Sequence, residues 1–242
     1  MTERPLVDFD AAPPMPVGDY AQTVTRVNVG YDLLFTLTHC FLGALRRPDL
    51  ELLVVGAGGG EELARFLPGE PGWRVTGVDP SREMLGVAQT RAARLGAGDR
   101  VTLLRGTVDD LPPGARFDAA TCLFVLHFLP DAGKLALLRG IAGRLRPGAP
   151  LLVASGARVD DEALRGLRDD FLGAWLQYGE RLGMPAEQMA GTIARLVAQQ
   201  PAMTTPADYV RLLHAAGFAH VGSYFNVLGG GLVAWLARSG AA

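Results

Sequence analysis

A run of glycines after a short apolar stretch has the clearest chemical meaning in this sequence. Residues 52–55 are Leu-Leu-Val-Val, residues 56–60 are Gly-Ala-Gly-Gly-Gly, and a helix-like segment follows. Because glycine has no Cβ, backbone at such a turn can approach a ligand more closely than other residues allow. The order of strand, turn and helix therefore predicts a cradle for a nucleotide-like ligand at one edge of a sheet.

The spacing of these glycines narrows the ligand class. Dinucleotide-binding folds use Gly-x-Gly-x-x-Gly, whereas this turn reads Gly-x-Gly-x-Gly and has Glu61 where the third glycine of that motif would stand. The difference favours S-adenosylmethionine (SAM) over a nicotinamide cofactor. An NAD-dependent enzyme remains an alternative at this point.

Two acidic positions follow later predicted strands and can complete this site. Asp79 lies about 20 residues past the turn, where a carboxylate can accept both ribose hydroxyls. After the third predicted strand, Val108 can form an apolar wall for an adenine ring. Asp109 or a backbone carbonyl can accept a hydrogen bond from the exocyclic amine of the adenine. The structural alternatives are that Asp79 only favours a helix N-terminus and that Asp109 lies in a solvated loop.

His127 is the candidate general base. It lies in residues 123–128, Leu-Phe-Val-Leu-His-Phe, directly after the fourth predicted strand, where a substrate would meet the cofactor. Histidine suits this role because its ordinary pKa is close to neutral. The alternative is a structural histidine that begins the next helix.

Alternating apolar runs and amphipathic segments predict the fold. The α/β pattern predicts a doubly wound, Rossmann-like, mostly parallel seven-stranded sheet with an antiparallel C-terminal hairpin. The expected strands are 51–55, 74–78, 101–105, 119–124, 151–154, 218–227 and 232–238. The expected helices are 20–47, 61–66, 82–95, 134–145 and 206–216, together with a pair within 161–198 that is broken near 183–185.

This pattern also predicts a domain organisation. Residues 1–18 contain four prolines and read as a flexible arm, and residues 19–47 read as an N-terminal helical lid. Residues 48–242 form the cofactor-binding domain, and residues 161–200 are a helical insertion that covers the active-site mouth.

The bulk composition disfavours several classes of protein. The net charge of −2 and the absence of a basic arm argue against a direct nucleic-acid substrate. The four histidines and two cysteines lack zinc-ligand spacing, so no metal site is expected. Neither a signal peptide nor an apolar run of about 18 residues is apparent, so we expect a cytoplasmic protein without a membrane segment.

Residues from about 50 to 155 resemble the class I SAM-dependent methyltransferases. The resemblance rests on the glycine turn, the acid after the second strand, the segments at 106–112 and 123–128, and Leu-Arg-Pro-Gly at 145–148. One departure is Thr107, where the family commonly has Asp. The resemblance implies a cofactor-binding set of Gly56, Ala57, Gly58, Gly60, Asp79, Pro80, Met84, Thr107, Val108, Asp109 and Leu123, to which a second resemblance adds Tyr31.

A second resemblance reaches the flanks. Arg26, Gly30 and Tyr31 are similar to the Arg-x-x-x-Gly-Tyr element of carboxy-SAM synthases, which act in tRNA wobble-uridine modification, and residues 213–234 are similar to the C-terminal strands of that family. This implies that Tyr31 contacts the methionine end of the cofactor and that Arg195 faces a cofactor carboxylate. The departures are Ala57 and Gly58, where that family has Cys and Ser, and Leu123, where it has Asn.

The sequence thus predicts a methyltransferase that uses SAM, releases S-adenosylhomocysteine (SAH) and acts on a small molecule. The alternatives are a carboxy-SAM synthase-like enzyme that uses prephenate and a non-catalytic SAM-binding protein. The apolar terminal hairpin and the helical insertion leave surface for a homodimer. The candidate catalytic residues are His127 and Tyr31, and the candidate substrate-binding residues are Tyr20, Arg26, His127, Trp175, Tyr178 and Arg195.

Overall fold

The computed structural model describes most of the chain. The described residues are 9–11, 24–25, 28–181, 187, 190–191, 194, 203–227 and 231–240. The predicted break of the helical insertion, near 183–185, lies outside them.

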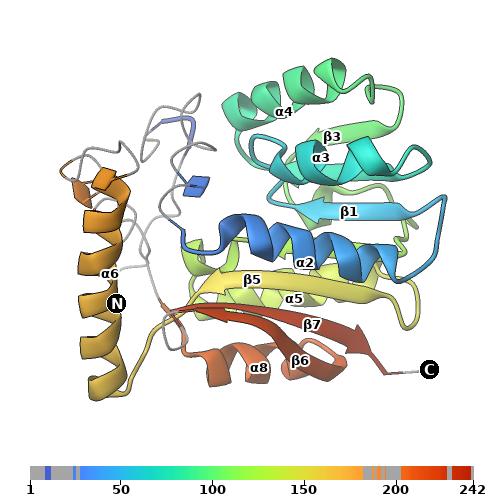
Figure 1. Ribbon diagram of the computed structural model, residues 1–242. Coiled ribbons are helices and arrows are strands. Elements are labelled where there is room, and N and C mark those ends of the chain that lie inside the picture. Colours follow the sequence, from blue (N-terminus) through green and yellow to red (C-terminus); the bar gives the residue numbers. More distant parts are fainter. Residues whose placement is uncertain are drawn as a thin grey trace.

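A seven-stranded sheet forms the centre of the molecule (Figure 1), which confirms the predicted fold class. Its order is β3-β2-β1-β4-β5-β7-β6. The pairs among β1 to β5 are parallel, and β7 pairs antiparallel with both β5 and β6. The strands are β1 (Glu51–Val55), β2 (Arg74–Asp79), β3 (Val101–Arg105), β4 (Ala119–Leu123), β5 (Pro150–Gly156), β6 (Phe218–Val227) and β7 (Leu232–Ser239).

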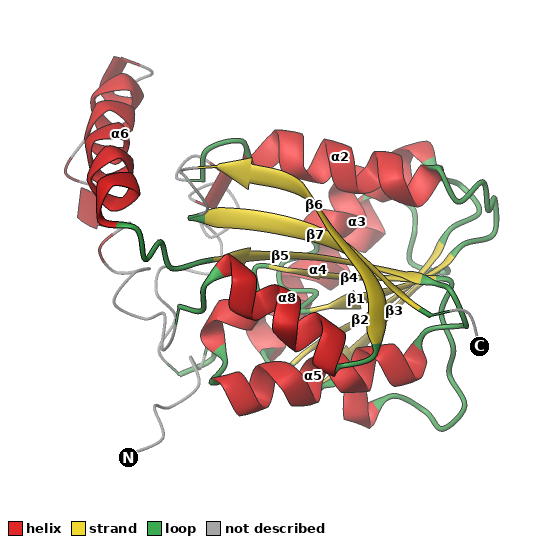
Figure 2. Ribbon diagram, turned by 90° about the horizontal axis from the view of Figure 1, so that it is seen from below, coloured by secondary structure: helices red, strands yellow, loops and turns green. Residues whose placement is uncertain are grey.

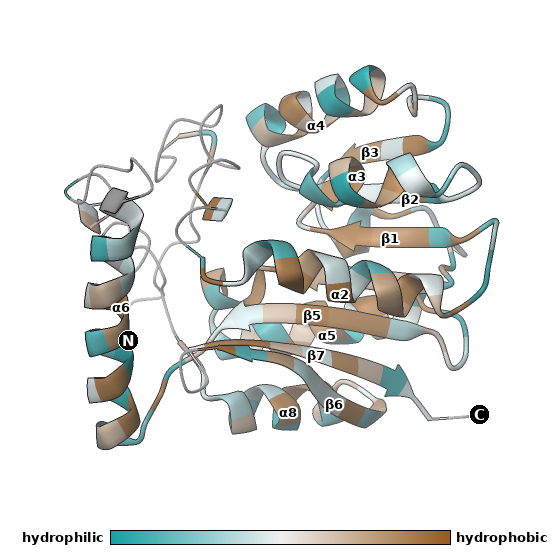
Figure 3. Cartoon of the chain, viewed as in Figure 1, coloured by the Kyte–Doolittle hydropathy of each residue, from teal (hydrophilic) through white to brown (hydrophobic). Residues whose placement is uncertain are grey.

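Helices cover both faces of this sheet (Figure 2), and their apolar sides build two hydrophobic cores. One face carries α2 (Tyr31–Gly43), α3 (Glu61–Phe66) and α4 (Arg82–Arg94), and the other carries α5 (Asp131–Arg144) and α8 (Pro206–Ala215). The central strands β1, β4 and β5 are almost wholly buried because helices pack on both sides, and β1 and β5 are correspondingly hydrophobic in Figure 3.

Two helix starts differ from the sequence prediction by more than one residue, and α2 also ends earlier than expected, at Gly43. Helix α2 begins at Tyr31 because Gly30 has a left-handed backbone (φ 74°), and a Cβ there would lie 2.8 Å from the ring of Phe225. Helix α5 begins at Asp131, three residues earlier than expected, with Pro130 as its N-cap residue. Ser81 caps α4, since its hydroxyl accepts a hydrogen bond from the Met84 amide.

Helix α6 (Glu162–Arg181) stands beside the sheet, on the side toward which the carboxyl end of β1 points (Figure 1). It begins one residue after the start of the predicted helical pair, at 161. Three short 3₁₀ turns complete the described structure: η1 (Leu67–Gly69), η2 (Val108–Asp110) and η3 (Leu126–Phe128). Both η2 and η3 lie beyond the carboxyl ends of strands, where open α/β sheets bind ligands.

Candidate active site

The glycine turn after β1 has the backbone geometry that its composition predicts. Gly56, Gly58 and Gly60 all have positive φ, at 73°, 48° and 76°. The amides of Gly56 and Ala57 both donate to the Val78 carbonyl at the end of β2, at 2.9 and 3.0 Å. The turn is therefore fixed against the neighbouring strand.

Asp79 ties this turn to the start of α4. Its Oδ2 accepts the Gly58 amide at 2.8 Å, and its Oδ1 accepts the Ser81 amide at 2.9 Å. Burial raises the pKa of Asp79 above its usual range, although both hydrogen bonds act in the opposite direction. The carboxylate still has acceptor capacity for a ligand, since each oxygen carries a second lone pair.

The loop after β3 is closed by a capping box. The Thr107 hydroxyl accepts the Asp109 amide at 3.3 Å, while Asp110 Oδ2 accepts the Thr107 amide at 2.7 Å. Asp110 Oδ2 also accepts the Thr107 hydroxyl at 3.1 Å, and the two bonds from Thr107 lower the pKa of Asp110. Thr107, at the position of the departure from the family pattern, therefore has a structural role in shaping this loop.

These segments surround one cavity of about 720 Å³, a volume within the usual range for small-molecule sites. Of the residues implied by the family resemblance, the following line it: Tyr31, Gly56, Ala57, Gly58, Asp79, Pro80, Met84, Thr107, Val108, Asp109 and Leu123. Val108 lies against one wall of the cavity, and Leu137 and Gly140 of α5 complete it.

Gly60 is not among the described residues that line the cavity. It is the N-cap residue of α3, and a Cβ there would lie 3.1 Å from Cα of Ala88 on α4. A glycine at this position allows α3 and α4 to pack closely, so its role in the structure is helix packing.

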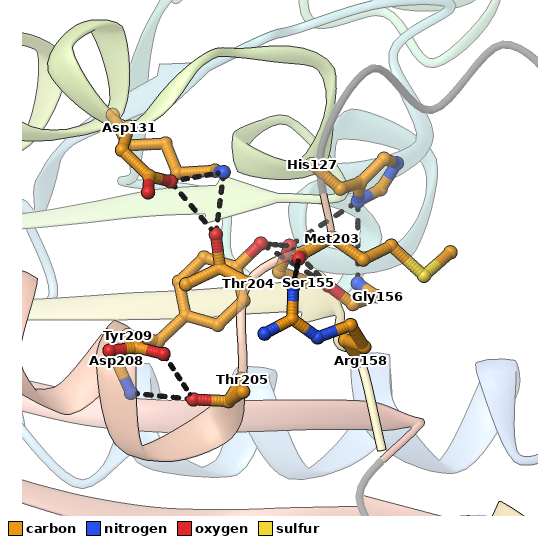
Figure 4. A network of polar contacts seen from close by, with 11 residues as sticks. His127, Asp131, Ser155, Gly156, Arg158, Met203, Thr204, Thr205, Asp208 and Tyr209 are labelled. Atoms are coloured by element: carbon orange, nitrogen blue, oxygen red, sulfur yellow. Dashed lines mark hydrogen bonds and ion pairs between the residues drawn. The ribbon is translucent and has the colours of Figure 1, made fainter. Parts of the chain in front are cut away.

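His127 is likewise not among the described residues that line the cavity. Figure 4 shows it beside Ser155 and Gly156 of β5. The Gly156 amide donates to His127 Nδ1 at 3.3 Å, and the same nitrogen lies 3.3 Å from the Ser155 hydroxyl. Tyr209 continues this network, 2.8 Å from Ser155. Burial, aided by the charge of Lys134, lowers the pKa of His127 to about 4, so this histidine is neutral at pH 7.

The position of His127 predicts a loss of stability in acid. The pKa is about 4 in the folded protein and 6.5 ordinarily, so the neutral form favours folding above about pH 6.5, and this contribution is lost as the pH falls toward 4. The difference corresponds to roughly 3 kcal/mol. Urea unfolding at about pH 7 and about pH 4 should show a smaller acid-induced loss in His127→Gln than in the wild type. Equal losses in both proteins would contradict this.

The structure describes only part of the predicted substrate set. Tyr20, Arg26 and Arg195 lie outside the described residues. On α6, the Trp175 ring stacks at 6.0 Å from the ring of Tyr178, and Tyr178 is half exposed. Neither side chain is among the described residues that line the cavity.

Aromatic residues that the sequence did not single out line the cavity beside Tyr31. Phe124 follows β4 with a left-handed backbone (φ 62°), which is strained for a non-glycine residue and is common at functional sites. Its ring stacks on Tyr31 with the ring centroids 5.4 Å apart, and the tilted ring of Phe35 lies 4.8 Å from Tyr31 between centroids. A positive φ is signalled in a sequence mainly by glycine or asparagine, so the conformation of Phe124 could not be predicted from its residue type.

Residues 9–11, within the segment expected to be flexible, contact the start of α4. Asp10 Oδ1 accepts the Ser81 hydroxyl at 2.6 Å and the Glu83 amide at 3.1 Å, and Oδ2 accepts the Arg82 amide at 3.0 Å. The bond from Ser81 is the main reason that the pKa of Asp10 falls to about 2. Phe9 and Asp10 both line the cavity, so this segment closes part of its mouth.

We expect Asp10→Ala to release this segment. SAM should then dissociate several-fold faster, because the segment no longer covers the cavity, while the melting temperature changes little. Stopped-flow displacement of bound SAM measures the rate, and Asp99→Ala, an exposed carboxylate elsewhere on the surface, is the control. An unchanged rate would mean that the segment does not retain the ligand.

The comparisons with known proteins agree with this geometry. The methyltransferase domain family matches residues 53–151. A ubiquinone biosynthesis O-methyltransferase of Idiomarina loihiensis is 29% identical over 184 residues, which cover 74% of this chain and 67% of that enzyme. For several other curated relatives, the match covers less than half of the relative's length.

Solved methyltransferase structures share the fold. The N,N-8-amino-8-demethyl-D-riboflavin dimethyltransferase of Streptomyces davawensis has a TM-score of 0.64 at 23% identity, over 98% of this chain and 62% of that one. The magnesium protoporphyrin IX methyltransferase of Synechocystis PCC 6803, with bound SAH, has a TM-score of 0.62 at 19% identity, over 92% and 93%.

The sheet order, the glycine turn and the acid after β2 are typical of the class I SAM-dependent methyltransferase fold. The methyltransferase domain match, the related methyltransferases and the shared fold support a methyltransferase that uses SAM as cofactor and releases SAH. The residues present fit that cofactor, because the turn presents backbone without Cβ atoms, Asp79 is a buried acceptor in the cavity, and Val108 and Leu137 are apolar walls. The resemblance to carboxy-SAM synthases remains a prediction.

Proposed function

We propose that the protein transfers the methyl group of SAM to a small, largely apolar acceptor that contains an aromatic ring. The observation that carries this proposal is that one cavity joins the cofactor segments to a group of aromatic side chains, namely Phe9, Tyr31, Phe35, Phe124 and Phe128. Aromatic walls favour flat apolar ligands through stacked and edge-on contacts. The ubiquinone biosynthesis enzymes among the relatives support the same acceptor class.

The proposed chemistry depends mainly on alignment. SAM supplies a methyl group already activated on a sulfonium, so the protein has to orient the acceptor for in-line attack and to exclude water. Tyr31 and Phe124 are placed to hold a ring in the cavity. We assign His127 a structural role, because its neutral ring is buried against Ser155 and is not among the described residues that line the cavity.

The lid and cover expected from the sequence remain part of this proposal. Val24, Tyr31 and Phe35, within the predicted lid 19–47, line the cavity, which supports a closing role for that segment. Residues 161–200 would cover the mouth from the side on which α6 stands.

Acceptor screening tests the proposal. Radiolabelled SAM should label phenols, catechols or hydroquinones, with a product heavier by one methylene, and should leave ribosomal and transfer RNA unlabelled. Label confined to RNA would overturn the acceptor class. A product heavier by a carboxyl group, formed with prephenate, would establish the carboxy-SAM alternative. SAM binding without turnover across the panel would favour a non-catalytic protein.

A homodimer and a cytoplasmic location are further proposals. Helix α6 exposes the apolar side chains of Leu164, Leu167 and Phe171, and a stripe of this kind is typical of a surface that another chain covers. Light scattering should then give twice the chain mass of 25.7 kDa, and a monomeric mass would exclude the dimer. Among the helices that the structure describes, none is both long and apolar enough to cross a membrane.

A further inference from the structure

A buried carboxyl group in the cavity has no role in the site described above. Glu62 is the second residue of α3, directly after the glycine turn, and it lines the cavity while only 5% of its surface is exposed. Its neighbour Glu61 forms ion pairs with Arg65 and Arg91, both at 2.7 Å. Among the described residues, no cationic side chain forms an ion pair with Glu62, and no other side chain donates a hydrogen bond to it.

The charges around Glu62 make its surroundings acidic. Glu61 on the same helix and Asp79 at the end of β2 both disfavour a negative charge there. The pKa of the Cys122 thiol on β4 is raised mainly by burial, and Glu62 adds to this effect. Arg65 is the compensating cation, but its guanidinium already bonds Glu61 and Asp32.

The protonation state of Glu62 follows from this environment. Burial is the main cause that raises its pKa to about 8, with Glu61 and Asp79 adding to the effect. Without a ligand, the carboxyl group is therefore mostly protonated and uncharged at pH 7. An apolar or amide side chain could fill this buried position without the unfavourable free energy of burying an unpaired carboxyl group. A carboxyl group that faces a ligand cavity can instead form an ion pair with a cationic group of the ligand.

SAM has two cationic centres, the methionine ammonium and the sulfonium. The sulfonium has to face the acceptor, which places it toward Leu123 and the aromatic group. With the adenine assigned to Val108 and the ribose to Asp79, the methionine part, which bears the ammonium, extends along the glycine turn that Asp79 contacts, and Glu62 adjoins that turn. We propose that Glu62 forms the ion pair with the methionine ammonium of the cofactor and releases its proton to solvent when the cofactor binds. This inference rests on the SAM site assigned above and deepens it.

Calorimetry in buffers of different ionisation enthalpy tests this proposal. At pH 7 the wild type should release close to one proton for each SAM or SAH bound. It should release none with 5′-methylthioadenosine, which lacks the methionine ammonium. Glu62→Gln should release none with any ligand and should bind SAM and SAH roughly 10- to 100-fold more weakly, since a charge-assisted contact is lost. Its affinity for 5′-methylthioadenosine should be unchanged.

The pH dependence gives a second measure. Ionisation of Glu62 must accompany binding, so the wild-type affinity for SAM should rise about tenfold per pH unit below pH 8 and then level off, and Glu62→Gln should lack this slope. Glu61→Gln is the matched control, because that carboxylate is already paired with arginines, and its proton release should persist. Glu62→Asp should restore part of the proton release. Melting curves confirm that each variant is folded.

The outcomes separate this proposal from the cofactor site itself. If wild type does not bind SAM, the cofactor site is wrong. If SAM binds without proton release and Glu62→Gln binds it equally well, only the role of Glu62 is refuted. Weaker binding of SAM with unchanged binding of SAH would place Glu62 at the sulfonium instead, and would contradict the ammonium assignment.

Discussion

Replacement of Asp79 by alanine should weaken SAM binding by on the order of 10²- to 10⁴-fold. A carboxylate that accepts both ribose hydroxyls makes two hydrogen bonds to a charged group, together worth about 3–6 kcal/mol. The change also removes the acceptor for the amides of Gly58 and Ser81, which loosens the glycine turn. Isothermal titration with SAM measures the dissociation constant directly.

Two variants control this experiment. Asp79→Asn keeps one acceptor oxygen, so we expect an intermediate loss of affinity. Asp49→Ala removes a carboxylate whose side chain is 80% exposed, ahead of the amino end of β1, and should bind SAM like the wild type. Wild-type affinity in Asp79→Ala would show that this carboxylate does not hold the ribose.

Replacement of Gly56 by alanine should destabilise the fold by about 4 kcal/mol and abolish SAM binding. The φ of 73° is strained for any residue with a Cβ, and a Cβ at this position would lie 2.2 Å from Cγ2 of Val125. To accommodate this Cβ beside Val125, either the turn or the segment after β4 has to move, and both line the cavity. Urea unfolding gives the change in the free energy of unfolding.

Gly58→Ala is the matched comparison for that variant. Its φ of 48° is also left-handed, but the nearest atom to a Cβ is the flexible end of Met84 at 3.4 Å. We therefore expect only the backbone strain, about 1–2 kcal/mol. Equal losses in the two alanine variants would mean that the contact with Val125 is relieved easily and has little influence on the turn.

The strands and the positions of the cofactor segments could be predicted from sequence because both depend on chain order. A buried parallel strand appears as an apolar run, and its carboxyl end fixes where the next loop lies. Asp79 and Val108 were found in this way, and both line the cavity. The left-handed start of α2 at Gly30 was missed, because the ring of Phe225 that crowds it comes from the distant strand β6.

The direction of side chains after a strand could not be predicted. His127 lies in η3, and whether it faces the cavity or Ser155 depends on packing against β5 and α8, which leaves no local sequence pattern. Asp10 belongs to a proline-rich segment without periodicity, and its contacts with Ser81 join residues 71 positions apart. From the sequence, Glu62 would be interpreted as a solvent-exposed acid in the first turn of a helix. Only its burial in the structure points to a role in cofactor binding.

The most direct test of the assigned site is a crystal structure of the protein with SAH. We predict the ribose hydroxyls within hydrogen-bond distance of the Asp79 carboxylate, the adenine against Val108, and the methionine part over the glycine turn beside Glu62. SAH bound elsewhere, or a ribose that does not contact Asp79, would contradict the assignment of this cavity as the cofactor site.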